Sequence, residues 1–301
     1  MVKRKHAFRF SVDVVFDCFN YAFFSLIVLA VLYPLYWVCI ASISDPNEVL
    51  LGRVVLWPKG LTFDGYKAIF QYPRIWMGYR NSLLYAVVGT FISLALILPA
   101  GYVTSRPDFI GRKAFLVMIT ITMFFSGGLI PTYFVIQNLG MENTMWALVI
   151  PGACSAYNVM VAKAFFTSNV PREVLESAMM DNCPNWLFFF RIALPISLPL
   201  VAVITVFTAV GHWNSYFSAL IYLRDDTKYP LQMILREILV QQDTSRMLAD
   251  IQYMEKAEDR RRLSELIKYG VIIVSSLPVL ILYPFLQKYF VKGVMVGSLK
   301  G

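Results

Sequence analysis

Charged side chains are scarce in this sequence of 301 residues, because Asp, Glu, Lys and Arg together make up only 15% of it. Soluble chains carry about 25%. Hydrophobic residues reach 58% and the mean hydropathy is +0.60, and the excess lies in long apolar runs. The composition therefore excludes an ordinary soluble domain and predicts an all-α integral membrane protein.

Residues for metal, disulfide or nucleotide chemistry are also few. The chain has two histidines and four cysteines, and no two cysteines fall in one predicted extracellular segment. Neither a metal site nor a disulfide framework is expected. The sequence contains no Gly-Lys dipeptide, so it lacks the GxxxxGK[ST] loop that cradles nucleotide phosphates. We expect no cofactor on this chain and no catalytic residue, because no cluster of nucleophile, base and metal ligands lies in the apolar runs.

Basic residues outnumber acidic ones, 27 to 19. A basic chain often binds nucleic acid. Here the Lys and Arg residues lie in the short gaps between apolar runs, which is the pattern that orients membrane proteins. We therefore expect the lipid bilayer, and no nucleic acid, as the partner of this charge.

Six apolar segments are long enough to cross a bilayer, since a spanning helix needs about 20 residues. The predicted spans are Tyr21–Ile43, Ser82–Ser105, Ala114–Ile136, Thr144–Phe166, Pro195–Leu223 and Leu266–Phe290. The first is too long for a signal peptide and is interpreted as a retained anchor. Kinks are expected at Gly211, Pro278 and Pro284. The whole chain is predicted to be one transmembrane domain, residues 1–301.

The Lys/Arg bias of the short loops predicts the orientation. Basic residues cluster before the first span, after the second and near the C-terminus, whereas the loop Gln137–Asn143 has none. Both termini are therefore predicted in the cytoplasm. Residues 44–81 and 224–265 become long outer loops. The second holds Lys256 and three arginines among acidic residues, which indicates either a solvated helix face or a surface that favours an acidic sugar.

The inner loop of residues 167–194 has the pattern helix, turn, helix. Asn169 is expected to cap the first helix, with Pro171 and Glu173 in its first turn. Asp181, Asn182 and Pro184 mark the turn, and a second short helix is expected from Asn185 to Ala193. The residues alone leave two interpretations open: an amphipathic element on the membrane surface, or a knob that docks into a partner's groove.

The residues from Glu176 to Cys183, followed by Leu194-Pro195 and Pro199, resemble the EAA loop of ABC importer permeases. Ser177, Asn182 and Cys183 depart from the family pattern, which has small residues and a glycine there. Asn tolerates positive φ better than other non-glycine residues, so the turn is expected to persist. Further similarity identifies the chain with the carbohydrate-uptake, maltose-permease-like second subunits. It is carried by Asn81-Ser82, Ala100-Gly101-Tyr102, Trp213-Asn214 and the tail Lys292–Gly301.

This resemblance implies a type I ABC importer permease in the bacterial plasma (inner) membrane. The implied partners are a second permease subunit, two ATP-binding subunits that carry ATP and Mg, and an extracytoplasmic solute-binding protein. The family's coupling helices seat in a cleft of the ATP-binding subunit. The residues that this assigns to coupling are Glu176, Ser177, Ala178, Asp181, Asn182 and Cys183, although Asp181 can also be a simple turn residue. The tail residues Gly297, Ser298, Lys300 and Gly301 are implied to reach the ATPase interface.

A polar and aromatic cluster in the fifth span, His212, Trp213, Asn214 and Tyr216, is the candidate substrate path. Sugars bind to apolar walls with a few polar anchors, but polar packing between helices gives the same pattern. The predicted function is import of a sugar or oligosaccharide, with an acidic one among the candidates. A permease for a non-sugar solute is the alternative. A secondary transporter is disfavoured because the spans lack acidic residues.

Overall fold

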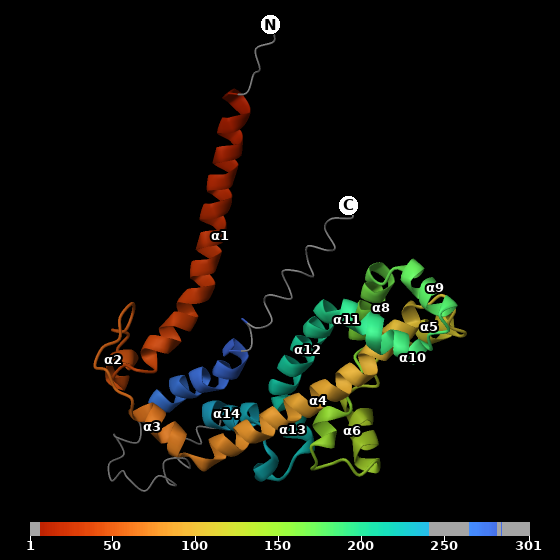
Figure 1. Cartoon of the computed structure of the whole chain (residues 1–301). Helices are drawn as coiled ribbons and strands as arrows, with labels where there is room; N and C mark the ends of the chain where they lie inside the picture. The colour runs from red at the N-terminus through yellow and green to blue at the C-terminus, as the bar shows by residue number, and fades with distance from the viewer. Residues whose placement is uncertain (1–6, 241–264, 282–283, 285–301) are drawn as a thin grey trace. The chain divides into compact units, whose positions relative to one another are not determined.

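A computed structural model describes residues 7–240, 265–281 and 284. Every regular element in these ranges is helical, as predicted. The helices are α1 (Ala7–Ala41), α2 (Pro46–Leu50), α3 (Asp64–Gln71), α4 (Pro73–Ser105), α5 (Arg112–Phe124), α6 (Leu129–Asn138), α7 (Trp146–Val149), α8 (Ala156–Asn169), α9 (Arg172–Met180), α10 (Asn185–Phe188), a π-helical turn (Phe189–Ala193), α11 (Leu194–Ile196), α12 (Leu198–Trp213), α13 (Tyr216–Tyr222), a 3₁₀ turn (Asp226–Lys228) and α14 (Leu231–Val240). Residues 265–281 form a further helix, drawn in blue and unlabelled in Figure 1.

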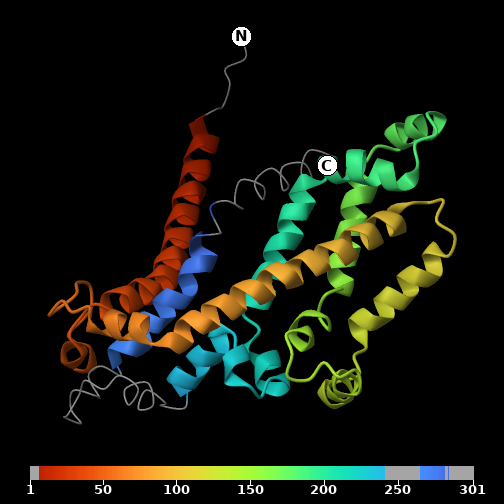
Figure 2. The same cartoon turned by 60° about the horizontal axis from the view of Figure 1, so that its bottom comes forward.

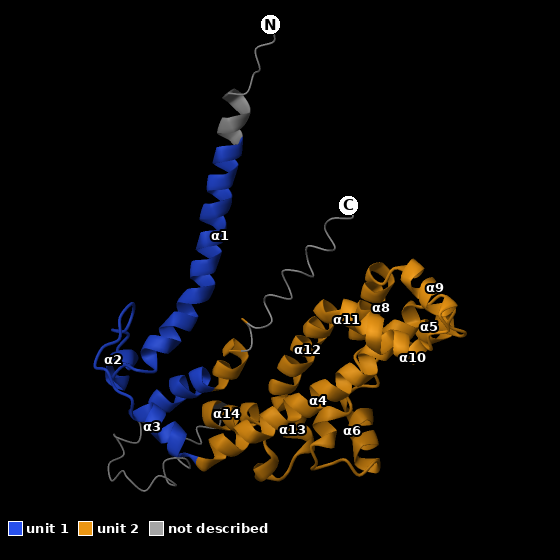
Figure 3. Ribbon diagram, viewed as in Figure 1, with its two compact units in different colours: residues 1–72, 243–274 blue, residues 73–242, 275–301 orange. Residues whose placement is uncertain are grey.

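The chain divides into two compact units, which Figure 3 colours separately. The first comprises residues 1–72 and 243–274. Its small core joins the end of α1 to α2, through Ile40, Ala41, Val49 and Val54. Trp37 of α1 meets Tyr269 edge-to-face, with ring centroids 5.5 Å apart. Between Val14 and Tyr36, α1 exposes many large apolar side chains, which suits a helix that lies in lipid or against another subunit.

The second unit, residues 73–242 and 275–301, is built on the long helix α4. Figure 2 shows α4 crossing α8 and α12. Three glycines mark its close approaches to other helices, because an added Cβ would meet a neighbour at less than 3 Å. At Gly78 it would lie 2.6 Å from Ile234, at Gly89 2.4 Å from His212, and at Gly101 2.4 Å from Ala162. Glycine at a crossing lets two backbones approach, as is common between membrane helices.

Two helices in the described part of the chain are long and apolar enough to cross a membrane, Asp13–Ala41 and Pro73–Ser105. Two bent pairs raise the number to four if each pair is one span. One is Arg112–Phe124 with Leu129–Asn138, bent by 116°, and the other is Asn185–Ile196 with Leu198–Trp213, bent by 82°. The expected number of six spans therefore stays a prediction, and the end of the sixth, residues 285–290, lies outside the described residues.

Helix breaks differ from the expected ones. The predicted segment 144–166 is interrupted between α7 and α8, where Pro151 and Gly152 stand. Pro151 cannot donate the backbone bond that would continue α7. The helix is not broken at Gly211, since α12 continues through it and ends at Trp213.

Candidate functional site

The loop of residues 167–194, here called the EAA-type loop, begins at the end of α8 and leads into α12. Val170 and Pro171 are extended, so the chain turns sharply before α9. The expected cap by Asn169 is wrong. This residue ends α8, and its amide donates to the Phe165 carbonyl at 3.1 Å. Pro171 is the N-cap residue that precedes the first turn of α9, and Glu173 lies inside that turn.

The turn after α9 is a Schellman motif, the usual left-handed end of a helix. Asn182 has φ of +52°. Its N–H donates to the Met179 carbonyl at 3.1 Å, and the N–H of Cys183 donates to the Ala178 carbonyl at 2.9 Å. The prediction that Asn182 keeps the turn despite replacing glycine is confirmed.

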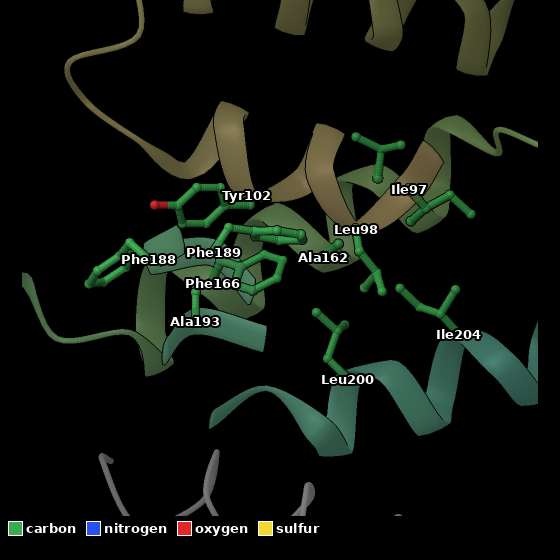
Figure 4. Packing of buried hydrophobic residues seen from close by; sticks show 11 residues of the cluster. Ile97, Leu98, Tyr102, Ala162, Phe166, Phe188, Phe189, Ala193, Leu200 and Ile204 are labelled. Carbon is green, nitrogen blue, oxygen red and sulfur yellow. The ribbon is translucent and has the colours of Figure 1, made fainter. Parts of the chain in front are cut away.

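An aromatic cluster packs between the EAA-type loop and the helices α4 and α8. Tyr102 of α4 contacts Phe166, Phe188 and Phe189, with ring centroids 5.7, 6.3 and 5.1 Å away. Figure 4 shows these rings together with Ala162, Ala193, Leu200 and Ile204. The second helix of the loop is not the regular one expected, because it passes from α10 into the π-helical turn that carries Phe189. The wider turn places Phe189 in the cluster.

The two faces of α9 have different surroundings. Leu175, Ala178 and Cys183 are partly buried and pack against the aromatic cluster. Ala178 thus contacts the chain's own core. On the other face Arg172 donates to Glu176 at 2.9 Å, with both side chains exposed, and Met180 is 85% exposed. A solvent-exposed methionine beside an exposed ion pair is typical of a surface that contacts another protein.

A buried arginine stands next to this helix. Arg106 follows α4 and is 7% exposed. Its Nε and Nη2 donate to both carboxylate oxygens of Asp108, at 2.8 and 2.6 Å, and its Nη1 donates to the Tyr102 hydroxyl at 3.0 Å. The hydrogen bond from Arg106 lowers the pKa of Asp108 below its ordinary value. The R-x-D spacing was the available signal for this bidentate pair.

A cavity of about 400 Å³ separates this ion pair from α9. Arg106 and Asp108 line one side, and Leu175, Glu176 and Met179 line the other. The residues after α4 and the EAA-type loop therefore line the same cavity.

Only two of the four candidate path residues lie together. His212 and Asn214 line a second cavity of about 420 Å³. Trp213 points elsewhere, since it packs near Tyr79 with ring centroids 6.0 Å apart and lines a different cavity. Tyr216 is 42% exposed and lines neither of these cavities. The cavity of His212 is also lined by Ser215, which belongs to the same sequence cluster, and by three polar residues that the sequence did not single out: Asn158, Thr208 and Ser218.

The tail residues Gly297, Ser298, Lys300 and Gly301 lie outside the described residues, as do Lys256 and the arginines beside it. Within the described ranges, no group of three or more His, Cys, Asp or Glu side chains is arranged to hold a metal ion.

Curated relatives match this chain from end to end. The polygalacturonan/rhamnogalacturonan transport system permease protein YtcP of Bacillus subtilis (strain 168) is 38% identical over 287 residues, which cover 95% of this chain and 99% of that protein. Protein LplC of the same organism is 37% identical, with 95% of each chain covered. The diacetylchitobiose uptake system permease protein NgcG of Streptomyces coelicolor is 25% identical over 96% of this chain.

A solved bacterial ABC transporter "involved in the import of the acidic polysaccharide alginate" contains a chain that matches with a TM-score of 0.82. It is 29% identical, and the match covers 96% of this chain and 100% of that one. Residues 75–296 match the family model of the binding-protein-dependent transport system inner membrane component. The chain therefore belongs to this family, as the EAA-type loop indicated, and is a membrane permease component of an ABC transport system, not an enzyme.

Proposed function

We propose that this permease forms, together with a second permease subunit, the membrane path for an oligosaccharide, with an acidic one as the first candidate. The observation that carries the proposal is the match over 99% of the length of a polygalacturonan/rhamnogalacturonan permease. The match to a chain of an alginate importer supports it independently. Both names refer to polymers of acidic sugars.

The proposed assembly contains two permease subunits, two ATP-binding subunits and an extracytoplasmic binding protein. ATP and Mg belong to the ATP-binding subunits. We propose six spans with both termini in the cytoplasm, an orientation in which the EAA-type loop would lie on the side of the ATPase. Closure of the ATPase dimer would move this loop as a rigid body and switch the path between inward and outward access.

The docking surface that we propose is the exposed side of α9 and the turn that follows it. Glu176 and Ser177 project from the helix, and Asp181, Asn182 and Cys183 form its end. The aromatic cluster that packs against α9 holds this helix rigidly. Packed cores deform little, so a displacement of α9 would be transmitted to the helices behind it. The tail residues Gly297, Ser298, Lys300 and Gly301 are proposed to reach the ATPase interface, on the family resemblance alone.

The cavity beside His212 is the part of the sugar path that we propose for this subunit. Two helix interruptions border it, between α7 and α8 and between α12 and α13. Inside a membrane, irregular backbone is tolerated where it lines a cavity. Asn158, Asn214 and Ser218 offer amide and hydroxyl groups to sugar hydroxyls. The described residues that line it include no Lys or Arg, and we propose that the second permease subunit meets the carboxylate of an acidic sugar.

The test is stimulation of ATP hydrolysis by the assembled transporter and its binding protein in proteoliposomes. We expect oligogalacturonides to stimulate hydrolysis and to be taken up. Neutral oligosaccharides of the same length serve as the control for acidity, and amino acids serve as the control for the sugar class. Equal stimulation of ATP hydrolysis by neutral sugars would contradict the preference for acidic sugars. Stimulation by amino acids alone would contradict the assignment to sugar transport.

A further inference from the structure

An apolar loop in the first unit carries a second membrane contact. Residues 53–59 read Arg-Val-Val-Leu-Trp-Pro-Lys, five apolar residues between two basic ones. Val54 is buried in the small core. Val55, Leu56 and Trp57 are exposed, Trp57 by 76%. Bare side chains of this size on neighbouring positions mark an interaction surface.

The backbone of this loop is bonded to α1 in an unusual way. Three successive carbonyls accept hydrogen bonds from aromatic side chains of α1. Trp37 Nε1 donates to Val54 at 2.9 Å, Tyr33 OH to Val55 at 3.3 Å, and Tyr36 OH to Leu56. In water these carbonyls would be solvated without help. In an apolar phase each must find a donor in the protein, because an unsatisfied group costs several kcal/mol.

The partners on α1 also fix the depth of the loop. Helix rise is about 1.5 Å per residue, so Tyr33 to Trp37 lie roughly 6–12 Å from the helix end at Ala41. The candidate span Asp13–Ala41 has 29 residues, which reaches through the hydrocarbon and both headgroup regions of about 40–45 Å. The loop therefore lies at the level where headgroups meet acyl chains. In Figure 1 it rises beside the last turns of α1, between α2 and α3.

The ends of the loop return to the level of the helix end. The carbonyl of Lys59 accepts from the Asp45 N–H at 2.8 Å, and the Thr62 N–H donates to Ile43 at 3.0 Å. Ile43 and Asp45 both lie in the short segment between the end of α1 and α2. The loop thus enters and leaves the bilayer on the same side. Arg53 and Lys59 stand where cationic side chains meet lipid phosphates, and Trp57 has the amphipathic ring typical of that zone.

We propose that residues 53–59 insert into the lipid interface at the C-terminal end of α1, with Leu56 and Trp57 in contact with the upper acyl chains. The exposed apolar surface of α1 continues onto the loop, and the three loop carbonyls find their donors within this chain, as an apolar phase requires, so we favour lipid over a protein partner. This contact would hold the first unit at a fixed depth, and it is independent of the transported solute.

The experiment uses the assembled transporter in proteoliposomes, with the four native cysteines replaced and transport verified. Trp57→Cys carries an environment-sensitive fluorophore. The control is Asp64→Cys, because Asp64 lies beyond the anchor at Thr62 and its side chain is 63% exposed. We expect the label at 57 to be quenched by lipids with a doxyl group high on the acyl chain and spared by aqueous iodide, with the reverse at 64. Iodide quenching at 57 equal to that at 64 overturns the proposal, and so does protection from both quenchers, which would mean that a protein covers the loop.

A second pair of variants covers the case in which the labelled protein does not assemble. Leu56→Asp and Leu61→Asp place the same charge at two exposed leucines, 58% and 67% exposed. Leu61 stands between Lys59 and Thr62, the two residues whose backbones are bonded to the segment after α1. In lipid nanodiscs we expect Leu56→Asp to lower the melting temperature of the complex, and Leu61→Asp to leave it unchanged. Equal effects contradict insertion.

Discussion

At the scale of single residues, Asn182 carries the turn that ends α9. Its φ of +52° costs most L-residues about 1–2 kcal/mol, whereas Asn and Gly adopt it readily. We expect Asn182→Gly to preserve the stability of the transporter and Asn182→Val to lower it by about that amount. Thermal unfolding of the purified complex measures both. Equal stability of the two variants would show that the turn is not held at positive φ.

The ion pair between Arg106 and Asp108 makes a second residue-scale prediction. Asp108→Asn removes the charge that balances a buried guanidinium. We expect a loss of about 1–2 kcal/mol, at the low end because the Asp108 side chain is 52% exposed. Asp108→Glu, which keeps the charge, should lose less. Unchanged melting of Asp108→Asn at neutral pH would contradict this assignment.

The pH dependence of this pair has a defined sign. Because the pKa of Asp108 is lowered in the folded chain, its contribution to stability is complete above the ordinary value of 3.8 and disappears as the pH falls through the folded value. The melting temperatures of the parent and Asp108→Asn should therefore differ by a constant amount at neutral pH and converge in acid. A difference that grows as the pH falls below 4 would contradict the account.

At the scale of elements, the crossing of α4 and α8 depends on Gly101. An added Cβ would lie 2.4 Å from the Ala162 side chain and 3.1 Å from its backbone, which cannot move aside easily. We expect Gly101→Ala to destabilise the complex by roughly 1–3 kcal/mol. The control is Gly211→Ala in α12, where a Cβ meets nothing within 4 Å and the helix gains up to about 1 kcal/mol. A Gly101→Ala complex as stable as Gly211→Ala would mean that the helices are not in contact there.

Hydropathy predicted the elements better than their interruptions. The mean hydropathy of a stretch locates apolar segments such as 114–136 and 144–166. It does not show where the helix within a segment is interrupted. Ser126-Gly127-Gly128 and Pro151-Gly152 were present as signals within those segments, and the chain breaks at both. The break after Trp213 has no comparable signal, because Asn214 and Ser215 occur in helices as well. The outcome there depends on tertiary packing.

The candidate site was predictable to a similar extent. The motif located α9 and the turn at Asn182, since both depend on local sequence. The motif assigned Ala178 to the contact with the ATPase, and in the structure Ala178 packs against the aromatic cluster of this chain. His212 and Trp213 are adjacent in sequence yet line different cavities. Neighbours on a helix point about 100° apart, so a run of polar residues cannot all face one path.

At the scale of the whole molecule, we propose two separate roles within the second unit. In this proposal the EAA-type loop receives movement from the ATPase, and the cavity beside His212 contacts the sugar. Asn214→Ala should therefore weaken uptake while basal ATP hydrolysis continues. It lies at the end of α12, where truncation removes a polar group from the cavity lining without opening a core. Normal uptake by this variant at limiting substrate would remove Asn214 from the path.

The central claim, that α9 couples ATP hydrolysis to transport, is tested most directly by measuring oligosaccharide uptake per ATP hydrolysed in proteoliposomes. The variants are Glu176→Lys and Asp181→Lys, with Glu173→Lys as a control for the same charge change in the first turn of α9. The account predicts that both motif variants insert and assemble normally but lose uptake, while ATP hydrolysis persists and the control retains transport. Normal uptake per ATP in Glu176→Lys and Asp181→Lys would contradict it.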